Sequence, residues 1–127
     1  MAGLVLDTGA LVALERRSRR VQVILTAAAQ DGIIPLVPTQ VIAQYWRGGD
    51  GHQAMVARFL SGCQVEQLDI LRAKQAGRLL GKSCTSDETD AVVALMAHEW
   101  GAVVTSDPND IKRLLRELHS TARVLNV

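Results

Sequence analysis

The chain is poor in cysteine. Its 127 residues include only two, Cys63 and Cys84, which are too few and too far apart to form a disulfide scaffold or a zinc site. We therefore expect two ordinary reduced thiols, as is usual in a cytoplasmic protein. The length suits one domain with a single hydrophobic core.

Long hydrophobic runs are also missing. Residues 1–17 are apolar for only a short stretch, which Asp7 interrupts. A signal peptide would instead begin with positive charge and continue with an unbroken apolar run. No segment approaches the roughly 18 uncharged apolar residues that a membrane span requires. We therefore expect a soluble, cytoplasmic protein with no membrane partner.

Neither sign of charge predominates. Lys and Arg number 14, Asp and Glu number 13, and the formal net charge is +1. This balance excludes a strongly cationic tail for nucleic acid and an acidic disordered segment. The charges are nevertheless segregated, since four arginines lie within 16–20 while Asp87, Glu88, Asp90 and Asp107 lie within 87–107. An acidic pocket beside a basic rim is compatible with this total.

Short apolar runs alternate with helical patterns, which is typical of an α/β domain built on a parallel sheet. Strands are predicted at 4–6, 33–37, 65–68, 102–105 and 123–125. Helices are predicted within 9–14, 20–30, 41–46, 51–61, 70–81, 87–99 and 108–119. No repeat, low-complexity segment or linker interrupts this order, so we predict one domain over residues 1–127.

Turn and cap residues support several of these boundaries. Pro38 is expected to close the second strand, and Thr39 to cap the helix that follows it. The Gly48-Gly49 pair is expected to end that helix. Asp69 is expected to cap the helix at 70–81.

Acids follow two of the predicted strands. Asp7 ends the first strand and Asp107 comes just after the fourth, and ligands of parallel sheets bind beyond the carboxyl ends of strands. Asp90 lies three residues after Asp87, so both can share one helix face. Carboxylates gathered from separate elements repel one another unless a cation lies between them. The pattern therefore suggests a site for Mg²⁺ or Mn²⁺, which take oxygen ligands.

Two of these acids have an equally good structural interpretation. Asp107 precedes Pro108, so it fits the N-cap of a helix with proline at its first position. Either Asp87 or Thr85 fits the cap of the helix at 87–99, with Thr85 and Glu88 forming a capping box.

The other two acids are harder to explain structurally. Nothing about the end of a strand requires an acid at Asp7. Asp90 is followed by the apolar run 91–95 and so borders a buried face, where an unpartnered carboxylate is costly. Asp7 and Asp90 are therefore the sharper functional signals.

Four segments in order resemble those of PIN domains, and more narrowly the toxin component of VapBC toxin–antitoxin pairs. They are LVLDTGALVALE, VPTQVIAQYWR, TSDETDAVVALMA and VVTSDPNDIKRLL. The resemblance covers essentially the whole chain and implies a three-layer α/β/α sandwich with a central, mainly parallel sheet. It also implies an Mg²⁺- or Mn²⁺-dependent endoribonuclease, an RNA substrate, a cognate VapB-like antitoxin that blocks the site, and a homodimer.

The resemblance assigns the family's catalytic acids to Asp7, Asp90 and Asp107. Asp87 matches an additional acid found in part of the family, and these four residues are the implied metal ligands. The implied reaction is hydrolysis of an RNA phosphodiester by metal-activated water. The family's remaining acid, a glutamate in the middle helix, is replaced here by Gln44.

Gln44 is the main departure from the family pattern. Glutamine keeps the shape and an oxygen acceptor of glutamate, but it carries no charge and cannot act as a base at neutral pH. Three alternatives follow for the site. It is active without this acid, it is weakened, or it is an inactivated form, either natural or engineered. In the last case the chain is a PIN-like module that retains antitoxin or RNA binding. Gln44 as a plain solvated residue, and a different metal-dependent phosphohydrolase, are further alternatives.

Other residues have open roles. The basic stretch 16–20 either lines the approach of RNA, pairs with acids of the antitoxin, or forms a solvated turn. The helix with Tyr45 and Trp46 offers a surface for an antitoxin tail, unless Trp46 belongs to the core or a dimer interface. The hydroxyls of Thr8 and Ser106 either orient carboxylates or bound water, or act as caps.

Overall fold

A five-stranded sheet, parallel throughout, forms the centre of the molecule. The computed structural model describes residues 3–48, 51–83 and 87–127, so the predictions for Gly49, Cys84 and Thr85 lie outside the described residues. The strands follow the order β3-β2-β1-β4-β5. They are β1 (Val5–Leu6), β2 (Leu36–Pro38), β3 (Gln64–Glu66), β4 (Ala102–Thr105) and β5 (Arg123–Asn126).

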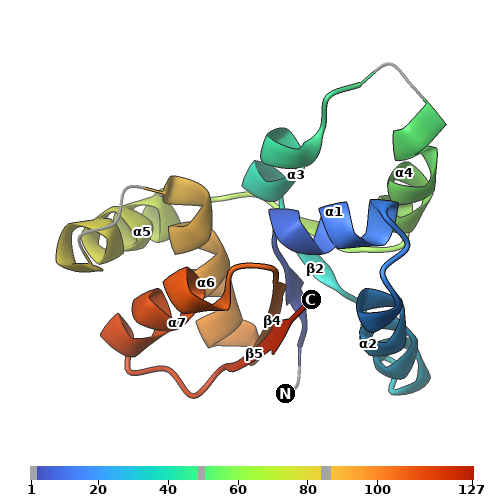
Figure 1. Cartoon of the computed structure of the whole chain (residues 1–127). Helices are drawn as coiled ribbons and strands as arrows, with labels where there is room; N and C mark the ends of the chain where they lie inside the picture. The colour runs from blue at the N-terminus through green and yellow to red at the C-terminus, as the bar shows by residue number, and fades with distance from the viewer. Residues whose placement is uncertain (1–2, 49–50, 84–86) are drawn as a thin grey trace.

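Helices cover both faces of this sheet. Before β3 the chain forms α1 (Thr8–Glu15), α2 (Arg19–Gln30), α3 (Thr39–Tyr45), a 3-10 turn (Gly51–Gln53) and α4 (Ala54–Ser61). After β3 it forms α5 (Ile70–Ser83), α6 (Glu88–Trp100) and α7 (Pro108–Glu117). The helices α1, α2 and α4 lie on one side of the sheet and α5, α6 and α7 on the other (Figure 1). This arrangement confirms the predicted α/β/α sandwich with a parallel sheet.

The inner strands and α6 make up the centre of the core. Every residue of β1 and β2 is buried, as are the last three residues of β4. In α6 the run from Ala91 to Ala97 is buried without interruption, which is why its sequence is apolar on all sides. Asp90 therefore stands at the edge of the core, as its sequence context predicts.

The predicted start of the second strand was wrong. The strand begins at Leu36 instead of residue 33, because Pro35 has no N–H to donate to a neighbouring strand. Ile34, in the excluded part, is exposed. Pro38 belongs to β2, where it pairs with Glu66, instead of closing the strand from outside.

Two cap predictions had different outcomes. Pro38 occupies the N-cap position of α3, and Thr39 is the first helical residue without a capping bond, so the predicted cap at Thr39 was wrong. Asp69 does cap α5, since its Oδ1 accepts a hydrogen bond from the Arg72 N–H at 2.8 Å. Among the described residues no helix is both long and apolar enough to cross a membrane.

Candidate functional site

The order in which the strands are added to the sheet reverses between β1 and β4, which are parallel neighbours. From β1 the strands continue outward to β2 and β3, and the chain then returns to β4 and β5. A crevice at the carboxyl ends of the strands is expected at such a reversal. The register pairs Leu6 with Val104, so the next residues, Asp7 and Thr105, follow side by side at this edge.

Asp7 has a structural role that its position at a strand end did not suggest. It is buried, and its Oδ1 accepts a hydrogen bond from the Ala10 N–H at 3.0 Å, which caps α1. The expectation that nothing structural requires an acid here was wrong, because a helix begins directly after the strand and leaves its first N–H groups unpaired.

The two acids with a structural interpretation behave differently from each other. Asp87 caps α6, since its Oδ1 accepts from the Asp90 N–H at 3.0 Å, as predicted. Asp107 occupies the N-cap position of α7 with Pro108 directly after it, but its side chain makes no capping bond and is exposed. Of these two positions, Asp107 is therefore the one at which the fold gives less reason for a carboxylate.

Thr105 connects Asp7 with Asp107, a connection that the sequence analysis missed. Its Oγ1 accepts a hydrogen bond from the Asp107 N–H at 2.9 Å, and its side chain also hydrogen-bonds the carboxyl of Asp7. Thr105 is completely buried. A hydroxyl at the end of an otherwise apolar strand was the available signal, because a buried polar group needs a partner.

Gly9 permits the close approach of the two segments that carry these acids. A Cβ at Gly9 would lie 2.0 Å from the Ser106 Oγ and 3.0 Å from the Ser106 N. The first turn of α1 thus packs directly against the connection between β4 and α7. The predicted role of the Ser106 hydroxyl in orienting carboxylates or bound water stays a prediction. The close packing of the Ser106 backbone against Gly9 fixes the backbone position of the next residue, Asp107.

The acids lie within one electrostatic field. Burial, and to a smaller extent the carboxylates of Asp87, Asp7, Asp110 and Asp107 in that order, together raise the pKa of Asp90 to about 7. Asp110, in the first turn of α7, was not among the predicted site residues. Its spacing of three residues from Asp107, the same as that between Asp87 and Asp90, was the signal that could have identified it.

The carboxyl of Asp7 responds to the same field. Burial raises its pKa, the hydrogen bonds from Thr105, Ala10 and Gly9 lower it, and the Asp107 carboxylate raises it slightly. The net shift is upward. Desolvation therefore outweighs three hydrogen bonds, and no positive charge is among the groups that act on Asp7.

No cation compensates these acids within the described parts of the chain. Both ion pairs found there are made by Arg72, with Asp69 at 3.4 Å and Glu99 at 3.1 Å. Oxygen donors and uncompensated negative charge suit a hard divalent cation. However, residues 3–48, 51–83 and 87–127 contain no group of three or more Asp, Glu, His or Cys side chains arranged to hold a metal ion. The site therefore fits such an ion in charge and donor type, without a preassembled ligand set.

Gln44 is brought to the edge of this cluster by α3. The Thr8 hydroxyl, directly after Asp7, donates a hydrogen bond to the side-chain oxygen of Gln44. Next to it the Tyr45 hydroxyl donates to the Glu15 Oε1 at 2.7 Å. These two bonds join α3 to α1, so position 44 faces the segment that follows β1. Thr8 thus positions Gln44 and does not cap a helix.

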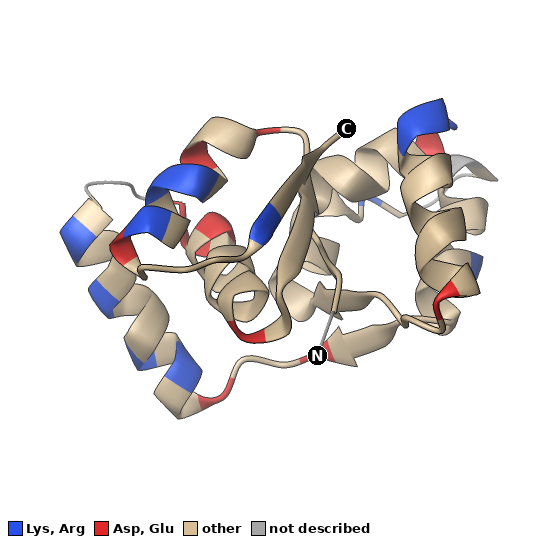
Figure 2. Ribbon diagram, turned by 90° about the horizontal axis from the view of Figure 1, so that it is seen from below, with Lys and Arg blue, Asp and Glu red and all other residues tan. Residues whose placement is uncertain are grey.

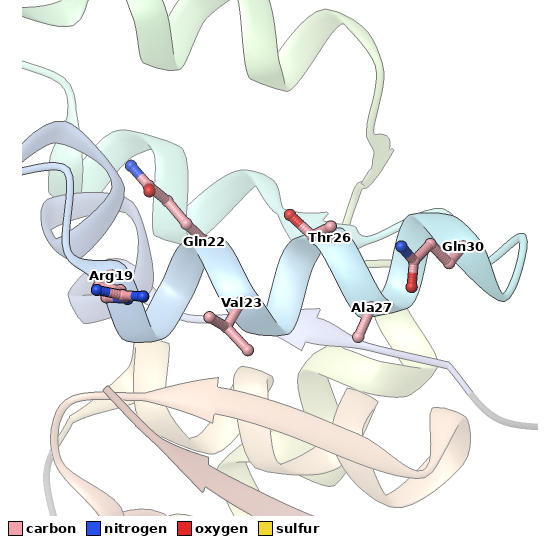
Figure 3. Close-up of a pocket in the computed structure, with 6 residues that line it drawn as sticks. All are labelled: Arg19, Gln22, Val23, Thr26, Ala27 and Gln30. Atoms are coloured by element: carbon pink, nitrogen blue, oxygen red, sulfur yellow. The ribbon is translucent and has the colours of Figure 1, made fainter.

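A groove of about 440 Å³ extends from this point along α1. Its lining includes Thr8 and Gln44 near the acids and two cations, Arg16 and Arg47. Of the arginines in 16–20, Arg16 therefore lies along the approach to the site. Arg19 lines a separate hollow on the outer side of α2 (Figure 3), whose other lining residues are Gln22, Val23, Thr26, Ala27 and Gln30.

Trp46 follows α3 and is 41% exposed, whereas Tyr45 is buried. The alternative that placed Trp46 in the core was therefore wrong, because α3 ends at Tyr45 and the chain leaves the helix there. An exposed indole beside the groove remains available for a partner.

Replacing Gly9 by alanine tests the close packing at the site. The new methyl group would force the Ser106 backbone away, so we expect Gly9→Ala to destabilise the protein by about 1–3 kcal/mol in urea unfolding. Gly77→Ala in α5, where nothing lies within 4 Å of the added Cβ, is the matched control and should stabilise by about 0.5–1 kcal/mol. Equal effects of the two substitutions would contradict the close approach.

The raised pKa of Asp90 predicts how stability depends on pH in the metal-free protein. The folded state retains the Asp90 proton up to a pH of about 7, while the unfolded state loses it near the ordinary aspartate pKa of 3.8. The free energy of unfolding should therefore fall as pH rises between these two values and level off above them.

Urea unfolding in EDTA at several pH values measures this slope. Between these pH values the free energy of unfolding should fall by on the order of 1 kcal/mol in the unmodified protein, and this fall should be absent in Asp90→Asn. The figure is reduced because the carboxyl of Asp90 is partly exposed. Glu88→Gln, an exposed acid on the same helix, should leave the slope unchanged. A slope that persists in Asp90→Asn would show that another group causes it.

Comparison with known proteins supports the fold. The sequence matches no family model, and no curated protein matches it. Among solved structures, VapBC2 from Rickettsia felis bound to a DNA fragment from their promoter is similar, with a TM-score of 0.76, 17% identity and 98% of each chain covered. PAE2754 from Pyrobaculum aerophilum is similar with a TM-score of 0.62 and 18% identity, over 98% of this chain and 84% of that one. Together with the strand order, these similarities show that the chain has a PIN-like fold.

Proposed function

We propose that this protein is a metal-dependent endoribonuclease that acts as the toxin of a type II toxin–antitoxin pair. The observation that carries the proposal is that the carboxylates of Asp7, Asp87 and Asp107 all act on Asp90 beside the strand reversal of a PIN-like fold, while no ion pair among the described residues involves any of these acids. The similarity to a VapBC2 complex supports an antitoxin as the partner.

The proposed metal ligands are Asp7, Asp90, Asp107 and Asp87. When bound, Mg²⁺ or Mn²⁺ would polarise a phosphoryl oxygen and lower the pKa of a water molecule. The chain's own contribution is positioning. Thr105 holds the carboxyl of Asp7 and the backbone of Asp107, and the Ala10 N–H fixes the orientation of the Asp7 carboxylate.

The groove along α1 supports an RNA substrate. Arg16 and Arg47 line it and can neutralise phosphates, while its other end reaches Thr8 and Gln44 beside the acids. An antitoxin that blocks this site would have to supply the positive charge that the acids lack. A bound metal ion and the antitoxin would thus each neutralise the same carboxylates.

An RNA cleavage assay with purified protein tests the proposal. We expect Mg²⁺- or Mn²⁺-dependent cleavage that EDTA abolishes and that Asp107→Asn lowers by about 100-fold or more. Asp107 is the suitable position because its side chain makes no capping bond, so the fold should tolerate the change. Glu88→Gln, which removes the same charge from the start of α6, is the control and should cleave like the unmodified protein. Full cleavage by Asp107→Asn would contradict the assignment.

Gln44 raises a second candidate function, an impaired module that retains antitoxin or RNA binding. We expect Gln44→Glu to increase the cleavage rate by about 10-fold or more, because a carboxylate can accept a proton where the amide cannot. Glutamate can accept the same hydrogen bond from Thr8, so the fold should be retained. Cleavage by the Glu form alone would favour the impaired module, and equal rates would show that position 44 takes no part in the reaction.

A further inference from the structure

A row of cations extends along α5, on the side of the sheet opposite the groove of α1. The helix contains Arg72, Lys74, Arg78 and Lys82 but no acid. Lys74, Arg78 and Lys82 are spaced by four residues each and are all exposed. We call these three residues the basic stripe. Successive members lie about 6 Å apart along the helix axis.

The basic stripe is distinct from the cation that stabilises the fold. Arg72 points toward α6, where it pairs with Glu99, and it also pairs with Asp69. The described residues form no other ion pairs, so no member of the basic stripe is paired with an acid there. Three like charges on adjacent turns cost a helix a few tenths of a kcal/mol per pair, and no acid in α5 offsets that cost.

The stripe borders a hollow of about 350 Å³ between α5, α6 and α7. Arg78 and Lys82 line it together with Gln75 and His98, and Glu117 is its one acidic lining residue. The positive side chains therefore flank a surface depression instead of a flat helix face. Such a depression gives an anionic chain a place to lie.

The stripe also leads toward the acids. From Ser83, at the end of α5, the chain reaches Asp87, the cap of α6, in four residues, a span of at most about 14 Å. Figure 2 shows the blue positions repeated along α5 and red positions at the start of α6. Lys82 is thus the member of the stripe nearest in sequence to the candidate site.

We propose that the basic stripe binds the phosphodiester backbone of single-stranded RNA and guides the strand toward the acid cluster. Evenly repeated charges favour a ligand with evenly repeated phosphates over an acidic protein segment, whose carboxylates have no fixed spacing. Because α5 has no aromatic side chain on which bases could stack, the contact reads no base sequence. The fate of the guided strand, but not its binding, rests on the proposed ribonuclease function.

Binding of a labelled single-stranded RNA in EDTA, followed by fluorescence anisotropy over a range of KCl concentrations, tests the stripe without cleavage. The triple variant Lys74→Ala/Arg78→Ala/Lys82→Ala should bind about 10-fold more weakly or worse, and its salt slope should be smaller by about 2. The control Arg19→Ala/Arg20→Ala/Arg58→Ala removes three exposed cations from the opposite layer and should change affinity much less. Circular dichroism confirms that both variants are folded.

Equal losses in the two triple variants would overturn the proposal, since net charge alone would then explain binding. Unchanged affinity and slope in the stripe variant would also overturn it, as would stronger competition by polyglutamate than by unlabelled RNA. A protein that binds RNA through the stripe but cleaves none with Mn²⁺ would contradict the proposed function and leave this inference intact.

Discussion

The pairing of β1 with β4 is the constraint on which the candidate site depends. Because these strands are parallel neighbours although most of the chain separates them, their carboxyl ends bring Asp7 and Thr105 side by side. The Thr105 hydroxyl then fixes the start of the next connection, and Gly9 leaves room for it to pass. The backbone position of each acid is therefore set by secondary structure and backbone contacts.

Two of the acids cap helices and also act on Asp90. Asp7 and Asp87 cap helices, which stabilises α1 and α6. The same carboxylates raise the pKa of Asp90, which opposes folding above the pH where that group ionises. The gain from capping and the cost of repulsion therefore come from the same side chains, although the cap needs only the oxygen acceptor and the repulsion needs the charge.

The sequence was sufficient for the layered α/β architecture, because buried strands and amphipathic helices have distinct patterns. It also pointed to Asp7, Asp90 and Asp107 by their places beside strands and apolar runs. It was not sufficient for Thr105, Gly9 or Asp110, whose roles depend on which strands are neighbours and on how closely two connections pass. The boundary error at β2 arose because the apolar pattern continues through Pro35, where the hydrogen bonding cannot.

The continuous burial of α6 has a consequence for the lifetime of the protein. Asp90 lies in the first turn of α6, and the seven residues after it are buried, so the repulsion around it cannot be relieved by moving the helix outward. Protonation of Asp90 relieves it below a pH of about 7, and above that pH a positively charged ligand would do so. Any ligand that binds only the folded state shifts the folding equilibrium by mass action. A cation or a cationic partner that bound at these acids would then also protect the chain from unfolding and proteolysis.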